Sequence, residues 1–263
     1  MAFTEQQMYR YARHIVLPEI GGIGQSRLLD AKVLLVGAGG LGSPLVMYLA
    51  AAGVGTLGIV DHDRVELANL HRQIAHPTAQ IGMAKTESAT ITAHALNPET
   101  VIRAHQLKIA PDNAAEVIEP YDLVADGTDN FATRDVVHAA CLRLGKTLVS
   151  AAVQGIEGQL TTFKAHLGPP HPCYRCLFPS EPPADLIPTC AQGGVLGPAV
   201  GVVGSLQAVE VVKEILGLGE SLSGTILLYD ALGPHFRRIR IPRLPDCPVC
   251  GAQRGDGDGL GRS

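Results

Sequence analysis

A short apolar segment that runs directly into a cluster of glycines most constrains the fold of this chain. Residues Lys32–Val36 read KVLLV and are followed by Gly37-Ala38-Gly39-Gly40-Leu41-Gly42. A continuously apolar run of this length is typical of a strand buried on both faces of a parallel sheet. The glycines allow a tight turn into a helix and a close approach of backbone to a phosphate. The segment therefore predicts the first strand, turn and helix of a nucleotide-binding α/β fold.

Strand-like and helix-like segments continue to alternate beyond this point. We expect further strands at Leu57–Val60, Val101–Gln106, Asp122–Ala125, Thr147–Ala151 and Gln159–Lys164. We expect helices at Ser43–Ala52, Gly82–Leu96, Asp112–Ile118 and Phe131–Leu144. Right-handed crossovers then make a Rossmann-like, mostly parallel sheet flanked by helices.

The two ends of the chain have a different character. Residues 5–30 are predicted to be helical, and residues 165–194, which are rich in proline, are predicted to form a long surface loop. A helix at Pro198–Leu216 and two antiparallel strands, Thr225–Tyr229 and Phe236–Ile241, are expected to complete the sheet. We therefore expect a single domain over residues 1–251, followed by a Gly-rich, disordered tail at 252–263.

Charge and targeting signals narrow the class of protein. The formal net charge is −4, which favours neither nucleic acid nor an anionic membrane as a direct partner. The chain begins MAFTEQQMYR, without the basic and apolar regions of a secretory signal. Six cysteines without such a signal indicate a reducing compartment, so a cytoplasmic location is expected.

Four of the cysteines form two C-x-x-C pairs, Cys173/Cys176 and Cys247/Cys250. Each pair can place two thiolates on one metal ion, and together they match the tetrahedral Cys₄ set that zinc prefers. The pairs lie about 70 residues apart, which favours a metal-mediated cross-link within a larger domain over a compact zinc ribbon. The alternatives are disulfides or a redox C-x-x-C. With four thiolates bound, a zinc ion has no open position, so its role is predicted to be structural.

The glycine cluster fits G-x-G-x-x-G, and Asp61 follows it by about 20 residues, where a carboxylate can hold ribose hydroxyls. These residues would suffice to bind a dinucleotide, whereas binding a triphosphate needs more positive charge and a magnesium ion. Arg72 and Lys85 are candidate phosphate ligands, and Asp129 is a candidate Mg²⁺ ligand. The alternatives are that Arg72 and Lys85 are solvated helix charges and that Asp129 caps the helix beginning near Phe131.

Several longer motifs carry a family resemblance. In order along the chain they are RYARHIVLPEIGGIGQ, LVGAGGLGS, DHDRVELANLHRQ, GMAKTESA, DGTDNFATR, PCYRCLFP and CPVCG. This series resembles the ThiF/MoeB/HesA group of bacterial E1-like adenylyltransferases, over residues 5 to about 251. Members of that group activate ubiquitin-like sulfur-carrier proteins for thiamine, molybdopterin or thiolated-tRNA synthesis.

The resemblance implies a role for particular residues. It implies that the ATP site is lined by Gly39, Gly40, Asp61, Asn69, Arg72, Gln73 and Lys85, with Asp129 holding Mg²⁺. Arg13 resembles the arginine that reaches the phosphates bound by the neighbouring subunit of a homodimer. The two C-x-x-C pairs match the structural zinc ligands. Cys190 matches a cysteine that in some relatives becomes covalently linked to the carrier; the alternative is a small residue packed in the loop.

The implied reaction is attack of the carrier's C-terminal glycine carboxylate on the α-phosphorus of ATP, which gives an acyl-adenylate and pyrophosphate. The partner would be a carrier ending in Gly-Gly. A separate sulfurtransferase or cysteine desulfurase would supply sulfur, because no such domain follows residue 251. Three other readings remain open: an NAD(P)-dependent oxidoreductase, an ATP-dependent tRNA-modifying dehydratase of the same superfamily, and a non-catalytic nucleotide-binding scaffold.

Overall fold

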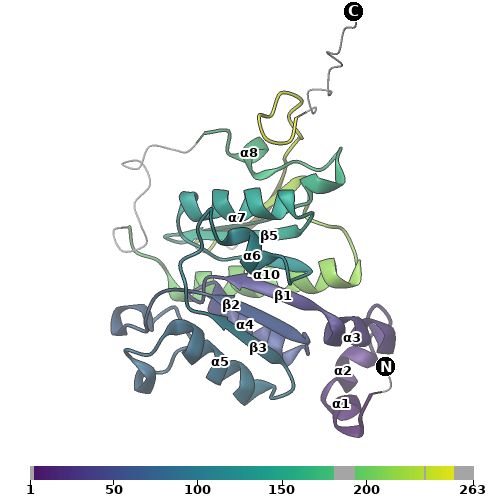
Figure 1. Ribbon diagram of the computed structural model, residues 1–263, viewed down its shortest axis with the longest axis vertical. Helices are drawn as coiled ribbons and strands as arrows, with labels where there is room; N and C mark the ends of the chain where they lie inside the picture. The colour runs from purple at the N-terminus through teal and green to yellow at the C-terminus, as the bar shows by residue number, and fades with distance from the viewer. Residues whose placement is uncertain (1–2, 181–192, 234, 252–263) are drawn as a thin grey trace, which may run out of the picture.

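The computed structural model describes residues 3–180, 193–233 and 235–251. In this part of the chain one sheet holds eight strands in the order β3-β2-β1-β4-β5-β6-β7-β8 (Figure 1). The strands are β1 (Lys32–Val36), β2 (Thr56–Val60), β3 (Val101–His105), β4 (Leu123–Asp126), β5 (Thr147–Gln154), β6 (Glu157–Phe163), β7 (Thr225–Asp230) and β8 (His235–Arg240). Strands β1 to β5 pair in parallel and β6 to β8 are antiparallel, which confirms the predicted fold class.

Helices cover both faces of the parallel half. They are α1 (Glu5–Arg10), α2 (Ala12–Ile15), α3 (Gly21–Asp30), α4 (Gly42–Ala51), α5 (Lys85–Leu96), α6 (Ala114–Ile118), α7 (Phe131–Arg143), α8 (Tyr174–Leu177) and α10 (Gly197–Leu216). One core cluster joins α3, α4, α5 and α10 to one face of the sheet, and a second joins α6 and α7 to the other.

Strand β1 lies between these two cores. Val33 and Leu35 belong to the first cluster, whereas Leu34 and Val36 belong to the second. Successive side chains of a strand point to opposite faces, so a strand covered on both sides must be apolar at every position. This explains the uninterrupted run of apolar residues.

Some element boundaries differ from those expected. Residues 5–30 form three helices, α1, α2 and α3, and α5 begins at Lys85 because Gly82 has a φ of +88° that does not fit a helix. Strand β5 extends to Gln154 because it forms a hairpin with β6, and the turn uses Gly155 at φ +61°. The described part of the expected long loop also contains a 3₁₀ turn, Ala165–Leu167, and the short helix α8.

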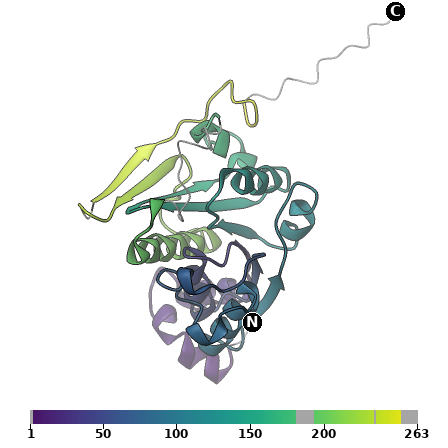
Figure 2. The same cartoon turned by 90° about the vertical axis from the view of Figure 1, so that its left-hand side faces the viewer.

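The order of the strands reverses at β1, whose neighbours are β2 on one side and β4 on the other. In open α/β sheets ligands bind in the crevice at the carboxyl ends of the strands at such a switch point. The N-terminal helices α1 to α3 lie at the opposite, amino-terminal end of β1 in Figure 1. Figure 2 shows the hairpin of β7 and β8 projecting from one side of the molecule.

No helix in the described residues has both the length and the apolar character that crossing a bilayer requires.

Candidate active site and metal centre

The glycine loop closes tightly between β1 and α4. Gly37 has a φ of +97°, and a Cβ atom at Gly42 would lie 2.1 Å from the carbonyl oxygen of Gly37. A Cβ atom at Gly40 would lie 2.7 Å from Cγ1 of Val200 on α10. These positions therefore accept only glycine without a rearrangement, and the loop directs the N-terminus of α4 toward the crevice.

A pocket opens at this crevice, between the carboxyl ends of β1, β2 and β4. Its lining combines glycines, charged and polar side chains, and an apolar wall. The polar and glycine lining is Gly37, Gly39, Gly40, Asp61, His62, Asp63, Arg72, Gln73, Lys85, Lys108, Gly127, Thr128, Asp129, Asn130, Thr133 and Arg134. The apolar lining is Val36, Leu41, Val60, Leu107, Ile109, Val153, Val195 and Val200.

Asp61 fixes the glycine loop from the end of β2. One carboxylate oxygen accepts a hydrogen bond from the backbone N–H of Ala38 at 2.8 Å, and the other accepts from the N–H of Asp63 at 2.9 Å. Each oxygen keeps further acceptor capacity, because an ionised carboxylate offers about four lone-pair sites. Asp61 can therefore hold the loop and still accept hydrogen bonds from the hydroxyls of a bound ribose.

Two cationic side chains lie in the pocket with fixed partners. The Lys85 side chain is only 5% exposed, and its ammonium group lies 2.8 Å from a carboxylate oxygen of Asp63. Burial alone would raise the pKa of Asp63, but the hydrogen bond and charge of Lys85 lower it below the ordinary value. Arg72 donates to the side-chain oxygen of Asn69 at 2.8 Å. Neither cation is therefore a freely solvated helix charge.

Gln73 is buried beside the glycine loop. Its Nε2 atom lies 3.4 Å from the place where a Cβ atom of Gly39 would stand. Its Oε1 atom is buried and accepts no hydrogen bond from the described residues. Because buried amide oxygens are rarely left without a donor, this atom suits a ligand or an ordered water in the pocket.

Two acidic residues at the end of β4 and in the segment after it have different environments. Asp126 is fully buried and accepts from the N–H of Thr128 at 2.9 Å, and burial raises its pKa. Asp129 is exposed and lines the pocket. The helix α7 is capped by Asn130, which accepts from the N–H of Thr133 at 2.9 Å. The alternative that Asp129 caps this helix is therefore wrong, and its carboxylate is available to the pocket.

Sequence reasoning missed three charged groups of the pocket, Asp63, Lys108 and Arg134. Arg134 is 8% exposed, donates from Nε to the carbonyl oxygen of Thr128 at 3.1 Å, and lies over the Phe131 ring at 5.8 Å. One sequence signal could have indicated Arg134: it stands at the end of DGTDNFATR, one helical turn after the N-cap of α7. The apolar wall gave no comparable signal in the sequence.

Two predicted site residues lie outside this pocket. Arg13, on α2, is exposed and forms no hydrogen bond or ion pair with the described residues. The helix lies at the opposite end of β1 from the pocket (Figure 1), so Arg13 does not reach the pocket of its own chain. Cys190 lies outside the residues that the structure describes.

The four cysteines of the two C-x-x-C pairs come together. Their Sγ atoms all lie within 4.8 Å of one another, and the measured Sγ–Sγ distances include 3.5 Å for Cys173–Cys247 and 3.4 Å for Cys176–Cys250. A tetrahedron with Zn–S bonds of about 2.3 Å requires Sγ–Sγ distances of about 3.8 Å. None of these thiols forms a disulfide. The donor set and its spacing therefore fit a structural zinc ion.

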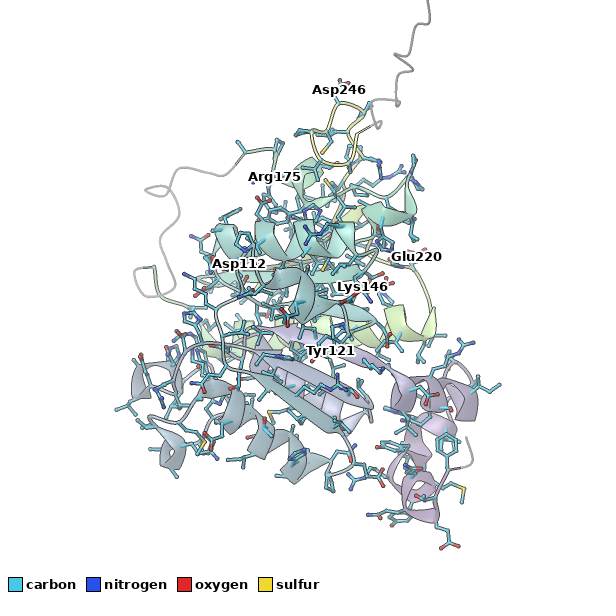
Figure 3. The ribbon with its side chains drawn as sticks, viewed as in Figure 1. Asp112, Tyr121, Lys146, Arg175, Glu220 and Asp246 are labelled. Atoms are coloured by element: carbon cyan, nitrogen blue, oxygen red, sulfur yellow. The ribbon has the colours of Figure 1, made fainter. Side chains whose placement is uncertain are left out.

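The pKa values of the cysteines in this cluster differ from one another. Burial raises the pKa of Cys250 to about 11. Burial alone would also raise the pKa of Cys247, but hydrogen bonds from the backbone N–H groups of Cys250 and Val249 and from neighbouring thiols together lower it to about 7. Leu244 also donates its N–H to Sγ of Cys176 at 3.4 Å. Figure 3 shows Arg175 and Asp246, the sequence neighbours of two of these cysteines, at the same end of the molecule.

Comparison with known proteins identifies the family. The family model described as "ThiF family" matches residues 11–249. A sulfur carrier protein adenylyltransferase of Thermus thermophilus is 47% identical over 95% of this chain and 93% of its own length. The adenylyltransferase and sulfurtransferase MOCS3 of Mus musculus is 50% identical over 96% of this chain, which spans only 54% of that relative.

Solved structures agree at the level of the fold. A crystal structure of Escherichia coli MccB with MccA-N7isoASN superposes with a TM-score of 0.80 at 24% identity, covering 93% of this chain and 74% of that one. A crystal structure of PaaA gives a TM-score of 0.78 at 21% identity, with 92% and 76% covered. The extent of the family match and the identity to its relatives together establish that this chain belongs to the ThiF family.

Proposed function

We propose that this protein adenylates the C-terminal glycine of a ubiquitin-like sulfur-carrier protein with ATP and releases pyrophosphate. The observation that carries the proposal is the pocket at the glycine loop, where Asp61, Arg72, Gln73 and Lys85 converge. It is supported by the Thermus relative, which is named a sulfur carrier protein adenylyltransferase and matches nearly the whole chain.

Different residues of the pocket bind different parts of ATP. The N–H groups of the glycine loop and the N-terminus of α4 face the phosphates, where the helix dipole favours negative charge. Asp61 accepts the ribose hydroxyls, and the apolar wall of Val60, Leu107 and Ile109 packs against the base. An NAD(P) site would leave Arg72 and Lys85 without a function.

The chemical step joins two anions, because a carboxylate oxygen of the carrier attacks the α-phosphorus as the bond to pyrophosphate breaks. Arg72, Lys85 and Arg134 lower the repulsion between these anions and fix their approach, so catalysis is by positioning and charge neutralisation rather than by proton transfer. Asp63 keeps the Lys85 ammonium group in place at 2.8 Å before the substrates bind.

Two metal ions accompany this proposal. The exposed carboxylate of Asp129 fits a Mg²⁺ ion, which takes oxygen ligands and which, when bound, neutralises phosphate charge. Cys173, Cys176, Cys247 and Cys250 fit zinc, which joins the loop after β6 to the C-terminal segment and takes no part in the reaction.

We further propose that Arg13 acts across a homodimer, completing the ATP site of the partner subunit. Its exposed position on α2, away from the pocket of its own chain, supports this role. An equimolar mixture of Arg13→Ala and Arg72→Ala proteins, co-refolded or co-expressed, then regains activity, because a mixed dimer contains one intact site. A mixture no more active than either variant alone contradicts the shared site.

Mass spectrometry of the carrier tests the adenylation itself. We expect a carrier ending in Gly-Gly to gain one adenylyl group in the presence of ATP and Mg²⁺, with one pyrophosphate released, and a carrier lacking its last glycine to gain none. The Asp129→Ala variant is expected to keep its thermal stability and lose the modification. The carrier that reacts names the pathway among thiamine, molybdopterin and tRNA thiolation. Release of inorganic phosphate without an adenylated carrier contradicts the proposal.

A further inference from the structure

His76 is a buried histidine that touches the glycine loop from the side away from solvent. It is 3% exposed and follows Gln73 closely in the chain. Its Nε2 atom lies 2.8 Å from the carbonyl oxygen of Ala38. A carbonyl oxygen can only accept a hydrogen bond, so the proton of this contact belongs to Nε2.

Ser88 on α5 lies against the other nitrogen of the ring. Its hydroxyl oxygen lies 2.7 Å from Nδ1 of His76 and 2.5 Å from the side-chain oxygen of Gln80. Burial is the largest cause that lowers the pKa of His76, and the charge of Lys85 acts in the same direction. Burial thus favours the neutral ring, and the carbonyl oxygen of Ala38 places its one proton at Nε2.

The backbone of Ala38 is consequently held on both sides. Asp61 accepts from its N–H at 2.8 Å, and His76 donates to its carbonyl oxygen at 2.8 Å. These two contacts fix the Gly37–Ala38 and Ala38–Gly39 peptide groups. Both groups adjoin a glycine, whose backbone rotates with little steric restriction, so neither orientation is ensured by local geometry alone.

The orientation of the Ala38–Gly39 peptide decides what the pocket presents to an anion. The C=O and N–H of a trans peptide point in opposite directions, so a carbonyl held toward the buried His76 ring turns the N–H of Gly39 the other way. Gly39 lines the pocket, and within the described residues its N–H donates no hydrogen bond. The reversed peptide would instead present a carbonyl oxygen, which repels phosphate.

We infer that His76 is a positioning residue, which holds the Ala38–Gly39 peptide so that the Gly39 N–H faces the phosphates of ATP. The inference rests on the proposed function, because it assigns the phosphate-binding side of the same pocket. His76 touches neither substrate nor reacting atoms. It acts through the glycine loop, so its loss weakens phosphate binding more than nucleoside binding.

Three variants separate this role from simple packing. His76→Leu removes the donor, and His76→Gln restores an N–H donor at the position of Nε2. His138→Leu is a matched control, because His138 is also 3% exposed but packs in the other core cluster against Phe163 and Tyr174. The affinities of the full-length protein for ATP with Mg²⁺ and for adenosine are measured by calorimetric titration, and stability is measured by thermal unfolding.

We expect His76→Leu to weaken ATP binding by about 10- to 100-fold, the range of one hydrogen bond to a charged group, and adenosine binding by less than about threefold. His76→Gln is expected to bind ATP within about threefold of wild type. His138→Leu is expected to lose thermal stability while keeping the wild-type ratio of ATP to adenosine affinity. Equal losses for ATP and adenosine in His76→Leu, or no recovery in His76→Gln, overturn the inference.

Two further outcomes keep the test decisive. If His76→Leu does not fold, Ser88→Ala replaces it, because this variant loses the hydroxyl that holds the Nδ1 edge of the His76 ring. A several-fold loss of affinity for ATP alone is then expected, whereas wild-type ATP affinity overturns the inference. The titrations need no carrier protein. Wild type that binds ATP tightly but adenylates no carrier refutes the proposed function and leaves the His76 test standing. Wild type that binds ATP no better than adenosine overturns the inference itself.

Discussion

Acidification is expected to destabilise this protein through His138, whose imidazole is buried on α7. Its Nε2 atom accepts a hydrogen bond from the backbone N–H of Tyr174 at 3.2 Å, so this nitrogen must stay unprotonated. Burial is the main cause that lowers its pKa from 6.5 to about 4; the nearby Asp135 raises it and Arg175 lowers it further. Protonation therefore favours the unfolded chain, in which the ring is solvated.

The pKa difference sets the size of the effect. The stabilising contribution is fully present above the unfolded pKa of 6.5 and is lost as pH falls toward the folded pKa of about 4. Proton linkage for such a shift gives a loss of about 2 kcal/mol in the free energy of unfolding between pH 7 and pH 5, and about 3 kcal/mol by pH 4.

Urea unfolding of wild type and His138→Leu at pH 7 and pH 5 measures this contribution of His138 to the free energy of unfolding. Wild type is expected to lose about 2 kcal/mol more than the variant over this interval. The other histidines with lowered pKa values, His76, His105, His166 and His171, titrate in the same direction in both proteins and cancel in the comparison. Equal losses in the two proteins would refute the reasoning.

Three other perturbations have defined outcomes. Removing zinc with a chelator is expected to lower the thermal unfolding midpoint by several degrees, with recovery on adding zinc, because the ion closes a loop of about 70 residues; an unchanged midpoint contradicts a structural zinc. Gly40→Ala places a Cβ atom 2.7 Å from Val200, so ATP affinity should fall about tenfold and recover in Gly40→Ala/Val200→Ala; equal affinity in the two variants opposes this explanation. Glu210→Ala leaves the buried N–H of Leu222 and the hydroxyl of Thr162 without their acceptor, so urea unfolding should show a loss of about 3 kcal/mol; a loss below about 1 kcal/mol rules out a stabilising role.

Local signals in the sequence were sufficient to predict the central sheet and the glycine loop. The run Val33–Val36 is apolar because both its faces are covered, and Gly42 must be glycine because of contacts within its own turn. The two C-x-x-C pairs were also predictable, since a shared metal is the simplest reason for two matching pairs in one chain. In each case the signal is a short motif that can be read directly from the sequence.

The remaining features depend on tertiary contacts that a single sequence does not display. The apolar wall of the pocket combines Val60 with Leu107 and Ile109, which come together only because the chain returns through α5 and pairs β3 with β2. Nothing in the sequence around His76 indicates a special role, because its contact with the carbonyl oxygen of Ala38 joins residues far apart in the chain. The helix predicted from Gly82 begins only at Lys85, because Gly82 has a positive φ and Ala84 forms a β-bridge to Arg64. The role proposed for Arg13 requires a second subunit.

Exchange of labelled pyrophosphate into ATP tests the central claim most directly, because label enters ATP only if adenylation is reversible at this site. With wild type and each candidate carrier ending in Gly-Gly, we predict exchange that requires the carrier. We predict that exchange falls by at least 100-fold in Arg72→Ala, because this variant loses a charge that the proposed function places at the reacting phosphates. Wild-type exchange in Arg72→Ala, or no exchange with any carrier by a protein that binds ATP, would contradict the account.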